Sequence, residues 1–254
     1  MLFRFVTAGA DGNTMGRPQR CIAIAAACAV LAGCSSTPVD SAPPVVRIKE
    51  AAKPSVSVPL NQVLPTGDQL TATMGVGPGL TGQLVVGGAD MLLQGVGESE
   101  ATPIECVGAG YRLQKVVYAA RPVREVASQS WAGGDFTGPP LSAFFGAVRF
   151  ATADDAQGFF AASADKWSRC NGQTLVLHQP EHGADGVSRI TDVVVENTVI
   201  SAVVLHGDGS TIQRALGVVS DCIVDVEITE ADGAGGARGA ISVANLMLQK
   251  IGAS

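Results

Sequence analysis

An export signal near the start of the chain decides which residues are left to fold. Arg17 and Arg20 form a short basic segment, and residues 21–32 follow as an unbroken apolar run that ends in small residues. Twelve helical residues rise about 18 Å, too short to cross a hydrocarbon core about 30 Å thick. We therefore interpret residues 1–33 as a signal peptide that is removed, and not as a membrane-spanning anchor.

The cleavage site Leu31-Ala32-Gly33-Cys34 resembles the bacterial lipobox. At such sites the cysteine thiol receives a diacylglyceryl group and becomes the mature N-terminus. The resemblance implies lipidation of Cys34 and attachment to the outer face of the cell membrane, because two acyl chains suffice for stable anchoring in the lipid bilayer. An ordinary secretory signal with a chance cysteine is the alternative.

Residues 10–14 are polar, so we expect translation to start at Met15; an extended basic segment is the other interpretation.

Composition excludes several functional classes. The 254 residues are 46% hydrophobic, too apolar for a disordered chain, and no second apolar run approaches the 18 residues of a spanning helix. The formal net charge is −6 without a basic cluster, which argues against nucleic acid, since phosphates need Lys or Arg. No cofactor motif is present: the glycine run at residues 75–79 lacks the Lys and Ser/Thr of a phosphate loop. We expect no cofactor.

Patterning places one folded domain after a tether. Residues 34–64 are assigned to the lipidated N-terminus and a Pro-rich linker, and residues 65–254 to the domain, roughly 190 residues, enough for one core. The predicted helices cover residues 66–74, a segment opening with a Thr102/Glu105 capping box, 152–170 and 241–251. The predicted strands cover residues 123–131, 144–151, 174–178, 187–195, 198–205, 211–219 and 222–228. This order predicts an α+β fold, with helices covering an antiparallel sheet.

The helix at residues 152–170 has the clearest pattern. Asp154 and Asp155 lie in its first turn, where acidic groups suit the helix dipole. A single helical face collects Ala156, Phe160, Ser163 and Trp167. The helix is predicted to end near Cys170, before Asn171-Gly172.

The histidines do not predict an active site. Residues 178–182 spell the inverted zinc-peptidase pattern H-x-x-E-H, which needs a helix to place both imidazoles on one metal. Pro180 opposes a helix there, so we interpret this segment as a loop and expect no metal site. His206 flanks a Gly-Asp-Gly turn, and no Ser–His–Asp grouping is visible. Asp225 and Glu227 are explained by strand alternation, and we expect no catalytic residues.

Three cysteines of the domain would face an oxidising compartment, where disulfides persist. They are Cys106, Cys170 and Cys222, so one bridge at most can form between them. We favour Cys170 with Cys222, which leaves Cys106 free. The alternatives pair Cys106 with Cys170 or Cys106 with Cys222.

Several features of the chain together resemble the mycobacterial PknH-like extracellular sensor domain. They are the lipobox, the Pro-rich tether, a helix ending in Trp167-x-x-Cys170, the segments Arg214-Ala215-Leu216 and Val224-Asp225-Val226, and a closing helix. In that family the module is either the outer part of a Ser/Thr kinase or a stand-alone lipoprotein. The resemblance covers about residues 65–251 and implies a twisted antiparallel sheet flanked by helices, with a cleft for an unidentified ligand. Members commonly carry two disulfides, whereas this domain has cysteines for one. The 254 residues contain no kinase domain, so no phosphotransfer is implied.

Three functions compete at this point. We favour a membrane-anchored cell-envelope lipoprotein that binds an unidentified small ligand or envelope protein without catalysis. A lipid or glycolipid carrier would need a long apolar cavity, and a cell-wall hydrolase would need carboxylates or histidines that converge in a cleft.

Overall fold

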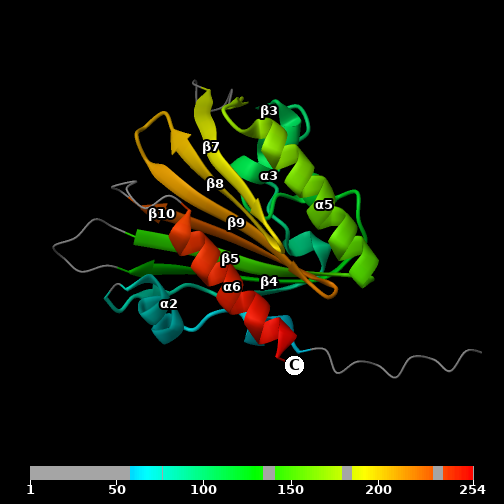
Figure 1. Cartoon of the computed structure of the whole chain (residues 1–254), viewed down its shortest axis with the longest axis vertical. Coiled ribbons are helices and arrows are strands. Elements are labelled where there is room, and N and C mark those ends of the chain that lie inside the picture. Colours follow the sequence, from blue (N-terminus) through cyan, green and yellow to red (C-terminus); the bar gives the residue numbers. More distant parts are fainter. Residues whose placement is uncertain (1–57, 76, 134–140, 179–184, 231–236, 254) are drawn as a thin grey trace, which may run out of the picture. The chain divides into compact units, whose positions relative to one another are not determined.

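Ten strands make one antiparallel sheet in the order β1-β4-β5-β10-β9-β8-β7-β6-β3, with β2 also paired to β4 (Figure 1). The computed structural model describes residues 58–75, 77–133, 141–178, 185–230 and 237–253. The strands are β1 Leu80–Thr81, β2 Val85–Gly87, β3 Ala101–Thr102, β4 Val123–Gly133, β5 Leu141–Phe150, β6 Thr174–Leu177, β7 Gly186–Glu196, β8 Val199–His206, β9 Thr211–Val219 and β10 Cys222–Glu230.

Helices cover both faces of this sheet, as the predicted α+β fold requires. The α-helices are α1 Leu60–Val63, α2 Gly67–Met74, α3 Val107–Gly110, α4 Lys115–Tyr118, α5 Ala153–Cys170 and α6 Arg238–Gly252, and the 3-10 turns are η1 Ala89–Met91 and η2 Ile104–Cys106. Alternate residues of the central strands point to opposite faces, and each face carries its own apolar core. We call them the α5 face and the α6 face. The predicted signal peptide, Cys34 and the linker up to residue 57 lie outside the described residues.

Helix α5 forms as its sequence predicts. The Thr152 hydroxyl accepts a hydrogen bond from the Asp155 backbone N–H at 3.1 Å, and both first-turn aspartates lie at the positive end of the helix. Phe159, Phe160 and Trp167 are buried on the side that faces the sheet. The helix ends at Cys170, where it was expected to end.

Helix α6 crosses the other face, over β9 and β10 (red in Figure 1). Its first N–H groups are capped from the sheet: the buried Gln213 side chain accepts from the backbone N–H groups of Gly239 and Ala240, at 2.8 and 3.2 Å. The α6 face also contains Leu60 and Val63 of α1, which are fully buried. The folded region therefore begins before residue 65, because two residues assigned to the linker belong to the core.

The segment after Thr102 differs from its prediction. A capping box at Thr102 and Glu105 was expected to open a helix. Thr102 instead ends strand β3, and its hydroxyl lies 3.0 Å from Nε2 of His178 on the neighbouring chain segment. Only the short turn η2 and the four-residue α3 follow, since Gly108 and Gly110 weaken any longer helix.

The disulfide joins Cys106 to Cys170, with the Cα atoms 5.6 Å apart. The favoured pairing of Cys170 with Cys222 was wrong. Cys106 and Cys170 lie in the core of the α5 face, whereas Cys222 starts β10 with its side chain in the core of the α6 face. The sheet thus separates Cys222 from the other two cysteines, and Cys222 is a buried free thiol.

Two ion pairs lie where the irregular segment at residues 106–118 covers the sheet. Arg214 of β9 lies in the α5 face with its side chain completely buried, and its Nη2 is 2.9 Å from Oδ1 of Asp225 on β10. Arg112 pairs with Glu227 on the same strand. We call these four residues the charged cluster. Strand alternation was correctly predicted for Asp225 and Glu227, but the face they occupy is covered.

Each group of the central pair also bonds to the covering segment. Arg214 donates to the carbonyl oxygens of Gly108 and Ala109 in α3, at 3.1 and 3.4 Å. Oδ2 of Asp225 accepts from the Leu113 backbone N–H at 2.8 Å and from the Tyr118 hydroxyl at 3.0 Å. Burial, together with this carboxylate, raises the pKa of Tyr118 well above its usual range, so the hydroxyl stays neutral and donates.

We predict that Asp225→Ala lowers the free energy of unfolding by about 3–5 kcal/mol, because it leaves the Arg214 guanidinium buried without its counter-ion. Asp165→Ala, which removes the exposed i,i+4 ion pair with Arg169 on α5, should cost no more than about 0.5 kcal/mol. Urea titration of both variants gives the comparison. Equal losses in the two variants would show that the buried pair has no special role.

We also predict that Cys222 is unreactive in the folded protein. Burial, with a smaller effect from Asp221, raises the pKa of its thiol to about 12. The pKa of this thiol in the unfolded chain is about 8.5, so the folded protein keeps the proton to a higher pH than the unfolded chain does. As pH rises from about 8.5 towards 12, deprotonation favours the unfolded chain and the free energy of unfolding falls. Iodoacetamide at about pH 9 should label the Cys222 peptide only after denaturant is added. Peptides with Cys106 and Cys170 should need a reductant as well; their labelling without one would contradict the assigned bridge.

Candidate functional site

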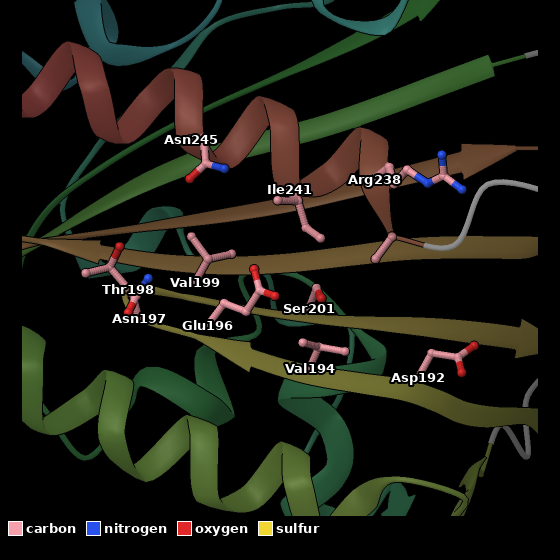
Figure 2. Close-up of a pocket in the computed structure, with 11 residues that line it drawn as sticks. Asp192, Val194, Glu196, Asn197, Thr198, Val199, Ser201, Arg238, Ile241 and Asn245 are labelled. Carbon is pink, nitrogen blue, oxygen red and sulfur yellow. The ribbon is translucent and has the colours of Figure 1, made fainter.

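A groove of about 490 Å³ runs along the α6 face, between the N-terminal half of α6 and the β7–β8 hairpin (Figure 2). It exists because α6 packs mainly on β9 and β10 and leaves the neighbouring face of β7 uncovered. The groove is lined by Asp192, Val194, Glu196, Asn197, Thr198, Val199, Ser201, Ala237, Arg238, Ile241 and Asn245.

A β-bulge shapes the wall formed by β7. The pairing register with β8 shifts between Thr191 and Val194. Before the bulge, Ile190 points into the core of the α5 face, and within the bulge Val193 packs against that core. The shift turns Val194 towards the groove, where its side chain is exposed. Asp192, at the bulge, has a φ of 51°, in the left-handed region that Asp tolerates better than most residues.

The groove carries charges of both signs. Asp192 and Glu196 on β7 and Arg238 on α6 are all exposed. Within the described residues, Glu196 and Arg238 take part in no ion pair. Figure 2 shows the Asp192 carboxylate pointing away from that of Glu196, while Asn245 and Ile241 point from α6 towards the strands. A ligand with separate positive and negative groups would find a partner for each.

The floor of the groove supplies a hydroxyl. Ser201 of β8 is buried, and its side chain has no hydrogen-bond partner among the residues that the structure describes. Beside it, Val199 provides an apolar surface. A floor with one hydroxyl and apolar neighbours fixes the orientation of a ligand by few polar contacts, as is usual in binding sites.

The residues that sequence reasoning examined for chemistry lie elsewhere. His178 contacts Asp185 at 3.3 Å near the β6–β7 edge, and neither lines the groove. Glu181 and His182, which complete the H-x-x-E-H pattern, lie outside the described residues. In the described part of the chain, no group of three or more His, Cys, Asp or Glu residues could hold a metal ion.

One contact of a catalytic type was missed by sequence reasoning. Ser188 Oγ lies 2.8 Å from Nδ1 of His206, because β7 and β8 place these residues opposite each other. Ser188 is only 1% exposed, so no substrate can reach its hydroxyl. Tyr111 lies beside this pair, and burial raises the pKa of its hydroxyl. We interpret the Ser188–His206 contact as a buried structural hydrogen bond.

Comparison with known proteins shows the family. A family model described as the PknH-like extracellular domain matches residues 57–250, so this chain belongs to that family. The crystal structure of the extracellular domain of PknH from Mycobacterium tuberculosis is similar, with a TM-score of 0.65 and 22% identity over 78% of this chain and 98% of that one. An uncharacterised Mycobacterium smegmatis protein matches with a TM-score of 0.39 and 12% identity, over 78% of this chain and 97% of that one. No curated protein sequence matches.

The family match agrees with the resemblance seen in the sequence, and the PknH structure agrees with the expected sheet flanked by helices. The family is one of extracellular domains, which is consistent with the export signal predicted from the sequence. Among the described helices, none has the length and apolar character to span a bilayer.

Proposed function

We propose that this protein is a cell-envelope lipoprotein held on the outer face of the cell membrane through acylated Cys34. Its PknH-like domain binds a small ligand or an envelope protein in the groove and catalyses no reaction. The proposal rests on the groove itself, where Glu196 and Arg238 face solvent without ion-pair partners among the described residues. Unpaired charges of opposite sign beside an apolar floor are suited to recognition.

The groove gives little support to a hydrolase. A glycosidase needs one carboxylic acid with a raised pKa and a second carboxylate across the scissile bond. Asp192 and Glu196 are both exposed on one strand, and their carboxylates point apart (Figure 2). A lipid or glycolipid carrier would need a long enclosed apolar cavity. The groove is open to solvent and edged by charged residues, so it fits this alternative poorly.

The anchoring part of the proposal is tested by Cys34→Ala. We expect this variant to leave the membrane fraction, because it lacks the thiol that carries the acyl chains. Cys28→Ala, which changes another cysteine within the apolar run of the signal, should stay membrane-bound. Fractionation followed by mass spectrometry of the N-terminal peptide reads out both variants. A fully processed Cys34→Ala protein that remains on the bilayer would contradict the anchor.

The binding part is tested with small zwitterions, for which Lys-Glu dipeptide is the first probe. At a hundredfold excess over its Kd, a ligand of the folded state adds about 2.7 kcal/mol, or about 5–10 °C in Tm. We expect Glu196→Gln and Arg238→Gln each to abolish this shift. Glu98→Gln, which removes an exposed carboxylate outside the groove, should keep it.

A rise in Tm that persists in both the Glu196→Gln and the Arg238→Gln variants would show that the dipeptide binds outside the groove. If neither Lys-Glu nor any other zwitterionic dipeptide raises the Tm, the inference from the groove charges fails.

A further inference from the structure

A second cavity, of about 300 Å³, opens on the α5 side of the domain. We call it the cleft. One wall is α5, and the other is the segment from Ile104 to Arg121, which contains η2, α3 and α4. The Cys106–Cys170 disulfide joins the two walls covalently. The cleft is distinct from the groove, since Phe159 and Trp167 belong to the core of the α5 face.

Helix α5 presents two rows of side chains to the cleft. Phe159, Ser163 and Trp167 recur every four residues and form the deep row. Ala162 and Lys166 form the outer row and are exposed. Ile104 and Val116 add apolar surface from the opposite wall. The interior is therefore mostly apolar, and polar groups occur at defined points.

Two largely buried side chains present polar groups to the cleft. Trp167 is 2% exposed and Ser163 is 6% exposed, and both line the cleft one helical turn apart. Neither the indole N–H nor the Ser163 hydroxyl has a hydrogen-bond partner among the described residues. The polar atoms that are sealed in the described core without a partner include the Trp131 indole nitrogen but neither of these two, so both donors face the cleft. The indole N–H can only donate, so its partner in a complex must be an acceptor.

The opposite wall leaves room beside the indole. A Cβ atom on Gly108 would lie 3.4 Å from Trp167 Nε1 and 3.2 Å from Cγ1 of Val117. Glycine at this position therefore keeps the space next to the donor open, whereas any side chain would begin to fill it.

Charges at the mouth favour an anion. Lys166 is exposed and pairs with no acidic group among the described residues. Arg121 has Asp155 as a loose partner at 3.9 Å, while Glu105 is the acidic residue that lines the cleft. A ligand here would accept hydrogen bonds from the Trp167 N–H and the Ser163 hydroxyl and would lie near the positive charge of Lys166. A carboxylate meets these requirements best, because it accepts hydrogen bonds and carries a negative charge.

We propose that the cleft binds a medium-chain fatty carboxylate. Its carboxylate accepts hydrogen bonds from Trp167 and Ser163 and is attracted by Lys166, and its chain covers Ile104, Val116 and Phe159. The site is independent of the groove and goes beyond the function proposed above. The pair of unpartnered donors that face a mostly apolar cleft carries the inference.

The two tryptophans allow a direct test by NMR. The chain contains only Trp131 and Trp167, so a ¹⁵N-labelled sample gives two indole N–H signals, and Trp167→Phe assigns them. The sample is the full chain with Cys34→Ser, so that no acyl group of its own competes. We expect decanoate to shift the Trp167 signal in a saturable way. Trp131, buried on the α6 face, should not respond.

Two leucine variants on α5 provide the matched comparison. Ala162→Leu adds bulk inside the cleft and should weaken decanoate binding by about tenfold or more. Ala161→Leu makes the same change at the adjacent exposed position, which does not line the cleft, and should bind as the parent does. An unchanged Trp131 signal in both variants shows that the fold is intact.

Three results with soluble probes would overturn the proposal. The first is the absence of a saturable shift at millimolar decanoate, and the second is equal binding by the Ala162→Leu and Ala161→Leu variants. The third is an equal shift with decyltrimethylammonium, which has the same chain but no acceptor. Vesicles of phosphatidylcholine should leave the Trp167 signal in place; a matching shift would assign the cleft to membrane lipid and exclude a free carboxylate.

Discussion

The buried ion pair between Arg214 and Asp225 is the constraint on which this architecture depends. The two residues lie on neighbouring central strands, and their side chains are 0% and 3% exposed. A desolvated charge pair is costly unless its remaining hydrogen-bonding capacity is used. Here that capacity is used by α3 carbonyls, the Leu113 amide and the Tyr118 hydroxyl, so the pair selects one position for the segment that covers it.

The two faces of the sheet consequently differ in character. On the α5 face, the disulfide and the charged cluster hold an irregular segment of low helix propensity against the core. On the α6 face, a single long helix covers the central strands and leaves the β7–β8 hairpin open. The groove and the cleft follow from these two different ways of covering one sheet.

Local sequence signals predicted much of the fold. The capped start of α5, its buried face and its end at Cys170 follow from residue spacing, and so do the strand alternation and hairpins of the C-terminal half.

Other features depend on tertiary packing. The disulfide could not be chosen because it depends on which face Cys222 occupies, and sequence spacing does not fix that face. The burial of Asp225 could not be predicted from the sequence. Its partner Arg214 lies 11 residues away on another strand, and the segment that covers both has weak secondary-structure signals. The groove depends on where α6 crosses the sheet, and its three charged residues carry no motif.

Amide hydrogen exchange at Leu113 tests the central claim most directly. This residue has a φ of 47°, and its N–H donates to the buried Asp225 carboxylate at 2.8 Å. If the ion pair organises the covering segment, the Leu113 amide should exchange only on global unfolding, as slowly as the Leu216 amide in β9. Exchange as fast as at the exposed Asp208 turn would show that the segment opens independently of the sheet, and would contradict the account.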